Sequence, residues 1–141
     1  MAVPDPSRTF APDAAALERL AEQALARLPE HFRRHLVGVT LRIDEEADDD
    51  VLRELGLDHP DELTGLYSGR SMREHSSWAS GELPPRITLY RRALLLEWVE
   101  SEVALEPLIA HVIIHEVGHH FGLSDADMHA LENSSGEEEE A

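Results

Sequence analysis

The sequence predicts a single α/β domain (α+β in its details) in which several helices alternate with about three short strands. The 141 residues match the usual size of one domain, about 100–200 residues. Apolar residues alternate with polar ones in short segments, as in half-buried strands, and recur at helical spacing in longer segments. An apolar content of 42%, with 29% charged residues, is sufficient for one hydrophobic core.

The first predicted helix follows residues 1–12, a proline-containing segment expected to be a flexible lead-in. Asp13 is predicted as the N-cap because its carboxylate can accept a backbone N–H, and Pro29 ends the helix. Between them, apolar side chains recur every three or four residues and would form one buried face: Leu17, Leu20, Ala21, Ala24, Leu25 and Leu28.

Three segments are predicted as strands. Residues 37–43 and residues 87–90 alternate apolar and polar side chains. A further strand is expected near Leu66–Tyr67, because the segment around it is long for a structureless loop. The acidic run at residues 44–50 is predicted to be a solvated loop, and residues 50–55 a short helix.

The C-terminal half of the chain is predicted to be mainly helical. Residues 93–100 favour a short helix. A longer apolar helix is expected from about Pro107, since proline suits a first helical turn, and Gly122 is expected to end it.

A last short helix is predicted to run through Glu132. Ser124 can cap it, with Asp127 in the reciprocal position of a capping box. Residues 133–141 are expected to form a disordered acidic tail, which leaves residues 13–132 as the folded domain.

Composition excludes several kinds of site and partner. The chain has no cysteine, so any metal must be held by histidine, aspartate or glutamate. Its formal net charge of -17 would repel phosphate backbones and anionic lipids, so neither nucleic acid nor a membrane is expected as a partner. The N-terminus has no apolar stretch of signal-peptide length, and a cytoplasmic location is therefore expected.

The most informative segment contains the pattern H-E-x-x-H. His115 and His119 are four residues apart, so on a helix they lie on one face and can bind one Zn²⁺ ion. Glu116 follows the first histidine, where its carboxylate can take a proton from a water molecule that the metal activates. We therefore predict His115 and His119 as metal ligands and Glu116 as the catalytic base.

An extension of this pattern predicts the third metal ligand. Gly122 follows His119 by three residues, and Asp125 follows Gly122 by three. A continuing helix would carry a later ligand away from the metal, so the chain must turn, and glycine permits such a turn. Asp125 is the predicted third ligand. Asp127, which also fits a helix cap, and Glu132 remain alternatives.

Five further side chains have both a functional and a structural interpretation. His120 is turned about 100° from the second ligand, which favours a position behind the ligands or on the surface. His111 lies one turn before the first ligand, and an ordinary packed or exposed residue is favoured over a pocket-lining one. For Tyr67 and Tyr90, packing at the core edge is favoured over oxyanion stabilisation. For Met128, core filling is favoured over a turn beneath the metal.

The segment HEVGHHFGLSD, residues 115–125, resembles the motif of the minimal zincin family of small bacterial metallopeptidase-like proteins, which are common in actinobacteria. The resemblance continues upstream through GELPPRITLYRRALL, residues 81–95, and less strongly through residues 64–72. It covers most of residues 36–132. The motif is also similar to that of metzincins such as snapalysin, in which an aspartate is the third ligand.

This resemblance implies a zincin fold, with a small sheet packed on the motif helix. It implies zinc held by His115, His119 and Asp125, with Glu116 as the base. The expected activity is that of a zinc metallopeptidase acting on a peptide or protein substrate. An edge strand near Leu66–Tyr67 or Ile87–Tyr90 would align the extended substrate by backbone pairing.

Two alternatives to a peptidase remain open. Only 16 residues follow Asp125, too few for a subdomain that would form the far wall of a cleft. The chain could therefore be a zinc-binding regulatory or interaction module with little turnover, or a homo-oligomer or partner could complete the cleft. A zinc hydrolase with a non-peptide substrate is the other alternative, because the motif does not determine which bond is attacked.

Overall fold

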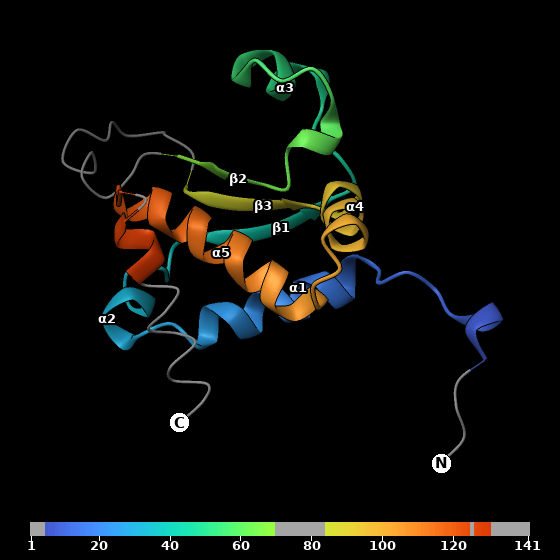
Figure 1. Ribbon diagram of the computed structural model, residues 1–141. Coiled ribbons are helices and arrows are strands. Elements are labelled where there is room, and N and C mark those ends of the chain that lie inside the picture. The colour runs from blue at the N-terminus through green and yellow to red at the C-terminus, as the bar shows by residue number, and fades with distance from the viewer. Residues whose placement is uncertain (1–4, 70–83, 125, 131–141) are drawn as a thin grey trace.

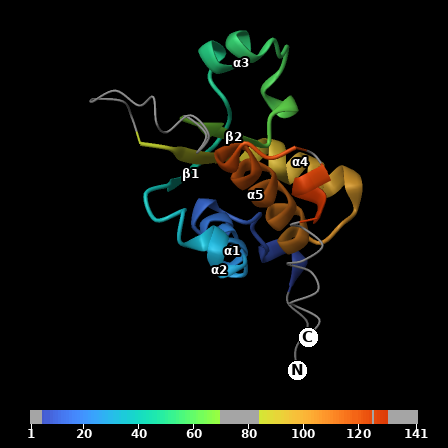
Figure 2. The ribbon, with the colours of Figure 1, turned by 90° about the vertical axis from the view of Figure 1, so that its left-hand side faces the viewer.

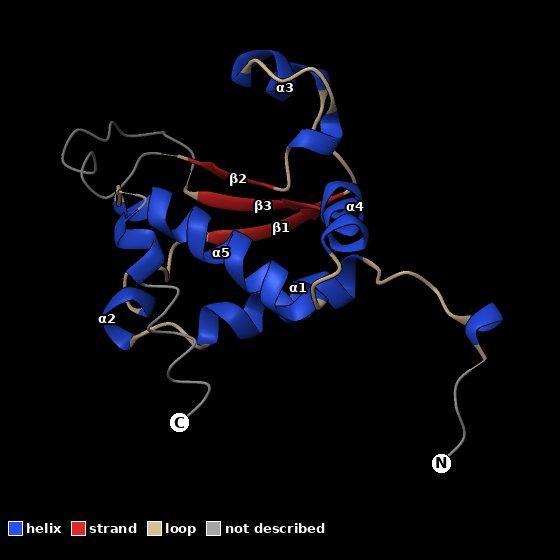
Figure 3. Cartoon of the chain, in the orientation of Figure 1, coloured by secondary structure: helices blue, strands red, loops and turns tan. Residues whose placement is uncertain are grey.

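A three-stranded mixed sheet forms the centre of the protein. The computed structural model describes residues 5–69, 84–124 and 126–130 (Figures 1 and 3). The strand order is β1 (Thr40–Asp44), β3 (Arg86–Tyr90), β2 (Gly65–Ser68). β1 is parallel to β3, whereas β2 is antiparallel to it. The predicted α+β fold with a small sheet is confirmed.

The central position of β3 decides which strand is free to pair with a further chain. Both segments proposed as a substrate-aligning edge are strands, but β3 pairs on both sides, with β1 and with β2. The proposal for Ile87–Tyr90 is therefore wrong. Of the two candidate segments, only Leu66–Tyr67, within β2, lies at an edge of the sheet.

Two long helices cover one face of the sheet. α1 (Ala14–Ala26) and α5 (Leu105–Phe121) lie side by side against it, as the two perpendicular views show (Figures 1 and 2). α4 (Arg91–Ser101) follows β3 directly and lies near one end of α5. The short helix α2 (Glu30–Arg33) follows α1, and α3 (Asp49–Leu55) lies beyond β2 at the top of Figure 1.

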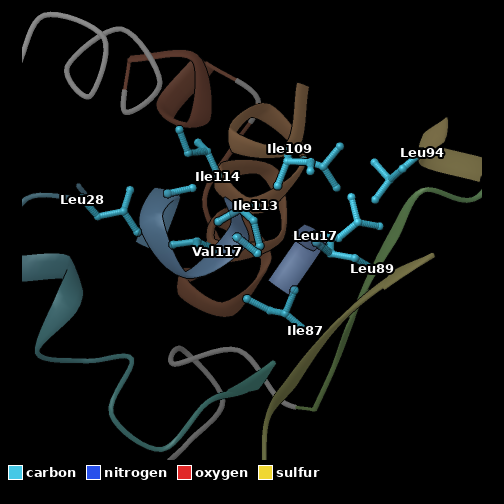
Figure 4. Close-up of a cluster of buried hydrophobic side chains, with 12 residues drawn as sticks. Leu17, Leu28, Ile87, Leu89, Leu94, Ile109, Ile113, Ile114 and Val117 are labelled. Carbon is cyan, nitrogen blue, oxygen red and sulfur yellow. The ribbon is translucent and has the colours of Figure 1, made fainter. Parts of the chain in front are cut away.

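The main core lies between these two helices and the sheet (Figure 4). Side chains alternate between the faces of a strand, so Ile87 and Leu89 of β3 point to the same side. They pack with Leu17 of α1 and with Ile109 and Ile113 of α5, and all five are almost completely buried. The helical period read from the sequence of α1 is confirmed.

A second, smaller core lies on the opposite side of the strands. The side chains of Leu66 and Tyr90 point to the other face of the sheet from those of Ile87 and Leu89. They pack with Ala47, Leu52 and Ala93. This cluster attaches α3 and its flanking loops to the sheet and to α4. The favoured interpretation of Tyr90 as a packing residue is confirmed, since its exposed fraction is 4%.

The predicted helix ends are largely correct. The Asp13 carboxylate accepts a hydrogen bond of 2.9 Å from the backbone N–H of Ala16 and caps α1. Gly56, with φ of 70°, ends α3, and Gly122, with φ of 68°, ends α5. α5 begins two residues before Pro107, which therefore lies in the first turn.

The largest departures from the predicted elements are at the N-terminal side of β1 and in the acidic run. Val37 lies in a turn with 88% of its surface exposed, so β1 begins three residues later than predicted. The acidic run is not one solvated loop, because Asp44 belongs to β1 and α3 begins at Asp49. The Asp48 carboxylate caps α3 by accepting the Val51 N–H at 2.9 Å.

Three short helical turns were not predicted: α2, a 3₁₀ turn at Pro6–Arg8 in the lead-in, and a second 3₁₀ turn, η2, at Pro60–Glu62. The predicted tail at residues 133–141 and the end of the last helix at Glu132 lie outside the described residues. Within the residues that the structure describes, no helix has the length and apolar character needed to cross a membrane.

Ile113→Ala should lower the free energy of unfolding by about 2–5 kcal/mol, because the Ile113 side chain of α5 is completely buried in the main core. Urea titration followed by circular dichroism measures this change. The control is Val99→Ala on α4, because 69% of this residue is exposed and the change should stay within about 0.5 kcal/mol. Equal losses in the two variants would contradict the assigned packing of α5.

Candidate metal centre and catalytic pocket

Helix α5 presents three rows of side chains with different surroundings. The row facing the main core contains Ile109, Ile113 and Val117, none of which has measurable exposure. A second row lies on the opposite side of the helix, because each of its members follows a core-facing residue by two positions. This row is exposed and consists of His111, His115 and His119. The motif histidines therefore occupy the side of α5 that the core leaves uncovered.

The third row of α5 faces strand β2 and contains Val112, Glu116 and His120, all of them buried. β2 approaches this row closely at Gly65. A Cβ atom at that position would lie 2.7 Å from Val112 Cγ1 and 3.4 Å from Glu116 Cγ. Glycine at the start of β2 therefore allows the strand to pack directly on the helix beside the motif glutamate.

The two predicted histidine ligands are neighbours at the wall of a pocket. Their ring centroids are 5.1 Å apart, and 47% of the His119 side chain is exposed. The pocket has a volume of about 380 Å³, and Glu116 and His111 also line it. His111 is thus both exposed and pocket-lining, and its ring lies 6.4 Å from that of His115.

Glu116 is a buried carboxylate held between α5 and β2. Only 5% of the residue is exposed, and the backbone N–H of Tyr67 donates a hydrogen bond to the carboxylate. Burial raises the pKa of Glu116 above its ordinary value, and the charge of His115 and the Tyr67 hydrogen bond oppose that rise. Glu116 Oε1 is 3.7 Å from Nδ1 of His119.

His120 is part of the connection between α5 and β2. Its Nδ1 lies 3.0 Å from the Tyr67 hydroxyl, and its Nε2 lies 3.3 Å from the backbone oxygen of His35. Only 1% of His120 is exposed, which excludes the surface position that was one of its two predicted locations. Its place four residues after Glu116 could have indicated this, because residues at that spacing share one side of a helix.

This contact also settles the position of Tyr67. Its ring packs on the main core, as predicted, and its hydroxyl group faces His120. In a neutral imidazole the proton would lie on Nε2, because the carbonyl of His35 can only accept, and Nδ1 would then accept from the Tyr67 hydroxyl. His120 and Tyr67 together join the motif helix to the strand that contacts Glu116.

The chain reverses direction immediately after the motif. Gly122 adopts a left-handed conformation, and its N–H donates to the carbonyl of His119 while the N–H of Leu123 donates to that of Gly118. These two bonds form the glycine-dependent helix end that the motif spacing predicts. The Asp127 N–H then donates to the Ser124 hydroxyl at 3.2 Å, and residues 126–130 are helical.

The three candidates for the third ligand differ in what the structure describes. Asp127 has the capping role expected from the sequence: its Oδ2 accepts the Ser124 N–H at 3.4 Å. Asp125 and Glu132 both lie outside the described residues. Among the residues that are described, no three histidine, aspartate or glutamate side chains are grouped to hold a metal ion.

Met128 lies directly against the motif helix. It is buried, and a Cβ atom at Gly118 would be 2.5 Å from both its Cγ and its Sδ. This contact explains a glycine in the middle of α5, where alanine would otherwise be the better helix former by about 1 kcal/mol. The last short helix is thus packed on the segment between Glu116 and His119.

The donor atoms in the pocket fit zinc in their chemistry. His115 and His119 offer imidazole nitrogens from the exposed side of one helix, and nitrogen is a preferred zinc donor. Neither histidine is buried in the core, so each can turn toward an ion in the pocket. Glu116 supplies a carboxylate beside them without leaving its buried position.

Comparison with known protein families gives one match. The sequence model of a family described as zincin-like metallopeptidase matches residues 36–135, more than half of the chain. No curated protein matches the sequence of the chain. The matched region begins before β1 and includes the sheet, α4, α5 and the residues that line the pocket.

Gly118→Ala should destabilise the protein although alanine favours a helix, because its methyl group overlaps Met128. We expect a loss of about 1–3 kcal/mol in the free energy of unfolding. In a Met128→Ala background the same change should become neutral or stabilising, since Cγ and Sδ are then absent. Denaturant titration of the four proteins gives the coupling energy. A coupling near zero would show that Met128 does not pack on Gly118.

Proposed function

Because the chain belongs to the family of zincin-like metallopeptidases, we propose that it hydrolyses peptide bonds with one zinc ion as cofactor. The observation that supports this most strongly is the combination of groups in one pocket. His115 and His119 stand exposed beside the buried carboxylate of Glu116, and the edge strand β2 borders all three. A bound zinc ion supplies a Lewis acid that polarises the scissile carbonyl and makes water more acidic.

In this proposal His115, His119 and Asp125 hold the metal. The two histidines belong to the side of α5 that faces the pocket. Asp125 is proposed from its spacing, three residues after the glycine that reverses the chain. Asp127 is already used as a helix cap, which favours Asp125 over it.

Glu116 is proposed as the general base. Its carboxylate takes a proton from the attacking water and passes it to the amine nitrogen of the leaving fragment, so that one water is consumed and the C–N bond breaks. The Tyr67 N–H keeps the carboxylate in place throughout.

Strand β2 is proposed to align the substrate. The Tyr90 N–H donates to the Thr64 carbonyl, so by the antiparallel pattern Thr64 and Leu66 point their backbone groups toward β3. Gly65 and Tyr67 then point theirs away from β3, toward the side on which α5 lies. An extended peptide bound there would pass along Gly65, which lines the pocket.

Zinc content tests the ligand set. The purified chain should contain about one zinc ion, and His115→Ala or His119→Ala should lower the zinc affinity by about tenfold or more, since even loss of an outer-shell partner costs about that much. His31→Ala, on α2 outside the pocket, is the matched control. Mass spectrometry and competition with a zinc-binding dye measure both quantities.

The same assay identifies the third ligand. Asp125→Ala should lower the zinc affinity, whereas Asp127→Ala should lower only stability, by about 1 kcal/mol for a lost cap. If Glu132→Ala weakens zinc binding and Asp125→Ala does not, the third ligand is Glu132. Unchanged zinc binding in both histidine variants would contradict the site as a whole.

Glu116→Gln should keep the zinc and lose the activity. The amide has nearly the same shape but cannot take a proton, so kcat should fall by about 10²–10⁴-fold. Cleavage of a quenched fluorescent peptide library by the zinc-loaded protein measures the rate, with a chelator as the second control. A zinc-loaded parent that cleaves no peptide would favour the binding-module alternative, and full activity in Glu116→Gln would exclude the proposed base.

A further inference from the structure

The pocket beside the motif extends away from the histidines toward α4 and the loop before β2. In that part of the pocket the lining is more apolar. Apolar residues from three parts of the chain are among its lining: Leu55 of α3, Leu63 just before β2, and Val112 of α5. This part of the pocket suits an aliphatic chain.

Two glutamates also line the pocket, and the two elements that carry them, η2 and α4, are in contact. Glu62 ends the turn η2, and Glu97 stands on the exposed surface of α4. The Glu62 carboxylate is held in place, because its Oε2 accepts the backbone N–H groups of Asp58 at 2.9 Å and His59 at 3.2 Å. Glu97 approaches from a separate helix, so the two acids come from different elements.

Among the described residues that line the pocket, the three histidines of α5 are the only basic side chains. The chain has no lysine, and none of its arginines is among the described side chains that line the pocket. The formal net charge of -17 adds to the negative potential at this wall. Beside Glu62 and Glu97 a positive ligand group is therefore favoured over a negative one, whereas the proposed zinc ion would attract negative groups to the histidine end of the pocket.

We propose that the pocket selects substrates with a long basic side chain, arginine or lysine, near the scissile bond, and that Glu97 and Glu62 determine this specificity. The aliphatic stem of such a side chain packs against the leucines, and its charged head lies between the two carboxylates. Arginine suits this wall best, because its planar guanidinium can bond a carboxylate through two N–H groups. This assignment rests on the proposed peptidase function and specifies its substrate class.

A matched pair of peptides tests the proposal. Arginine, or its neutral isostere citrulline, is placed in turn at each position of an alanine-rich peptide whose two ends are blocked, so that the side chain is its only cation. Binding to zinc-loaded Glu116→Gln protein is measured by fluorescence anisotropy, which needs no turnover. At one or two positions arginine should bind about fivefold or more tighter than citrulline. Equal binding at every position would overturn the proposal.

Glutamate-to-glutamine variants distinguish an effect of the two pocket glutamates from an effect of the protein's overall negative charge. Glu97→Gln should remove most of the preference for arginine. Glu100→Gln is the matched control, because it removes the same charge from the same helix outside the pocket lining. Glu62→Gln keeps an oxygen that can accept the two loop N–H groups and should also reduce the preference. Equal losses in Glu97→Gln and Glu100→Gln would assign the preference to net charge and overturn the proposal.

Parallel kinetics on the zinc-loaded parent distinguish this inference from the proposed function. If arginine peptides are cleaved with the higher kcat/KM and Glu97→Gln narrows the difference from citrulline, both are supported. If arginine peptides bind selectively but no peptide is cleaved, the peptidase proposal fails while the specificity of the pocket stands. If peptides are cleaved without regard to charge, the peptidase proposal stands and the basic-side-chain inference fails.

Discussion

Burial of α5 on two of its sides is the constraint on which the rest of the structure depends. One row of its side chains enters the main core with α1 and the sheet, and a second row faces β2. Only the row with His111, His115 and His119 remains open. A helix held on two sides cannot rotate, so the direction of the two motif histidines is set by apolar packing on the far side of the helix and not by the histidines themselves.

Strand β2 then determines the surroundings of Glu116. A carboxylate in an apolar environment is unfavourable unless its oxygens are hydrogen-bonded. The N–H of Tyr67 meets this need, and the Tyr67 ring is fixed in turn by the core and by His120. Gly65 is required on the same strand because a side chain there would push β2 away from Val112. The position of the glutamate is thus a consequence of how closely one strand approaches one helix.

The short segments around the sheet form the remaining walls. η2, the end of α3 and α4 contribute the side of the pocket that lies toward the start of α5, and the helix at residues 126–130 packs on Gly118 through Met128. α3 and the loops that flank it are attached by the small cluster of Ala47, Leu52 and Tyr90, whereas α4 contributes Ala93 to that cluster and Leu94 to the main core. A short chain can therefore combine a rigid motif helix with a pocket whose walls come from separately attached elements.

The sequence by itself determined the features that depend on neighbours along the chain: the Asp13 cap, the helix ends at Gly56 and Gly122, the period of α1 and α5, and the family to which the chain belongs. Only the tertiary structure decided that β3 is the central strand, that His120 meets Tyr67, and that Glu62 and Glu97 share a wall with the motif. The physical reason is distance. Caps and helical periods are set by hydrogen bonds and side chains within about four residues. Strand order and the contacts of buried polar groups depend instead on which segments far apart in the sequence bury their apolar surfaces against each other.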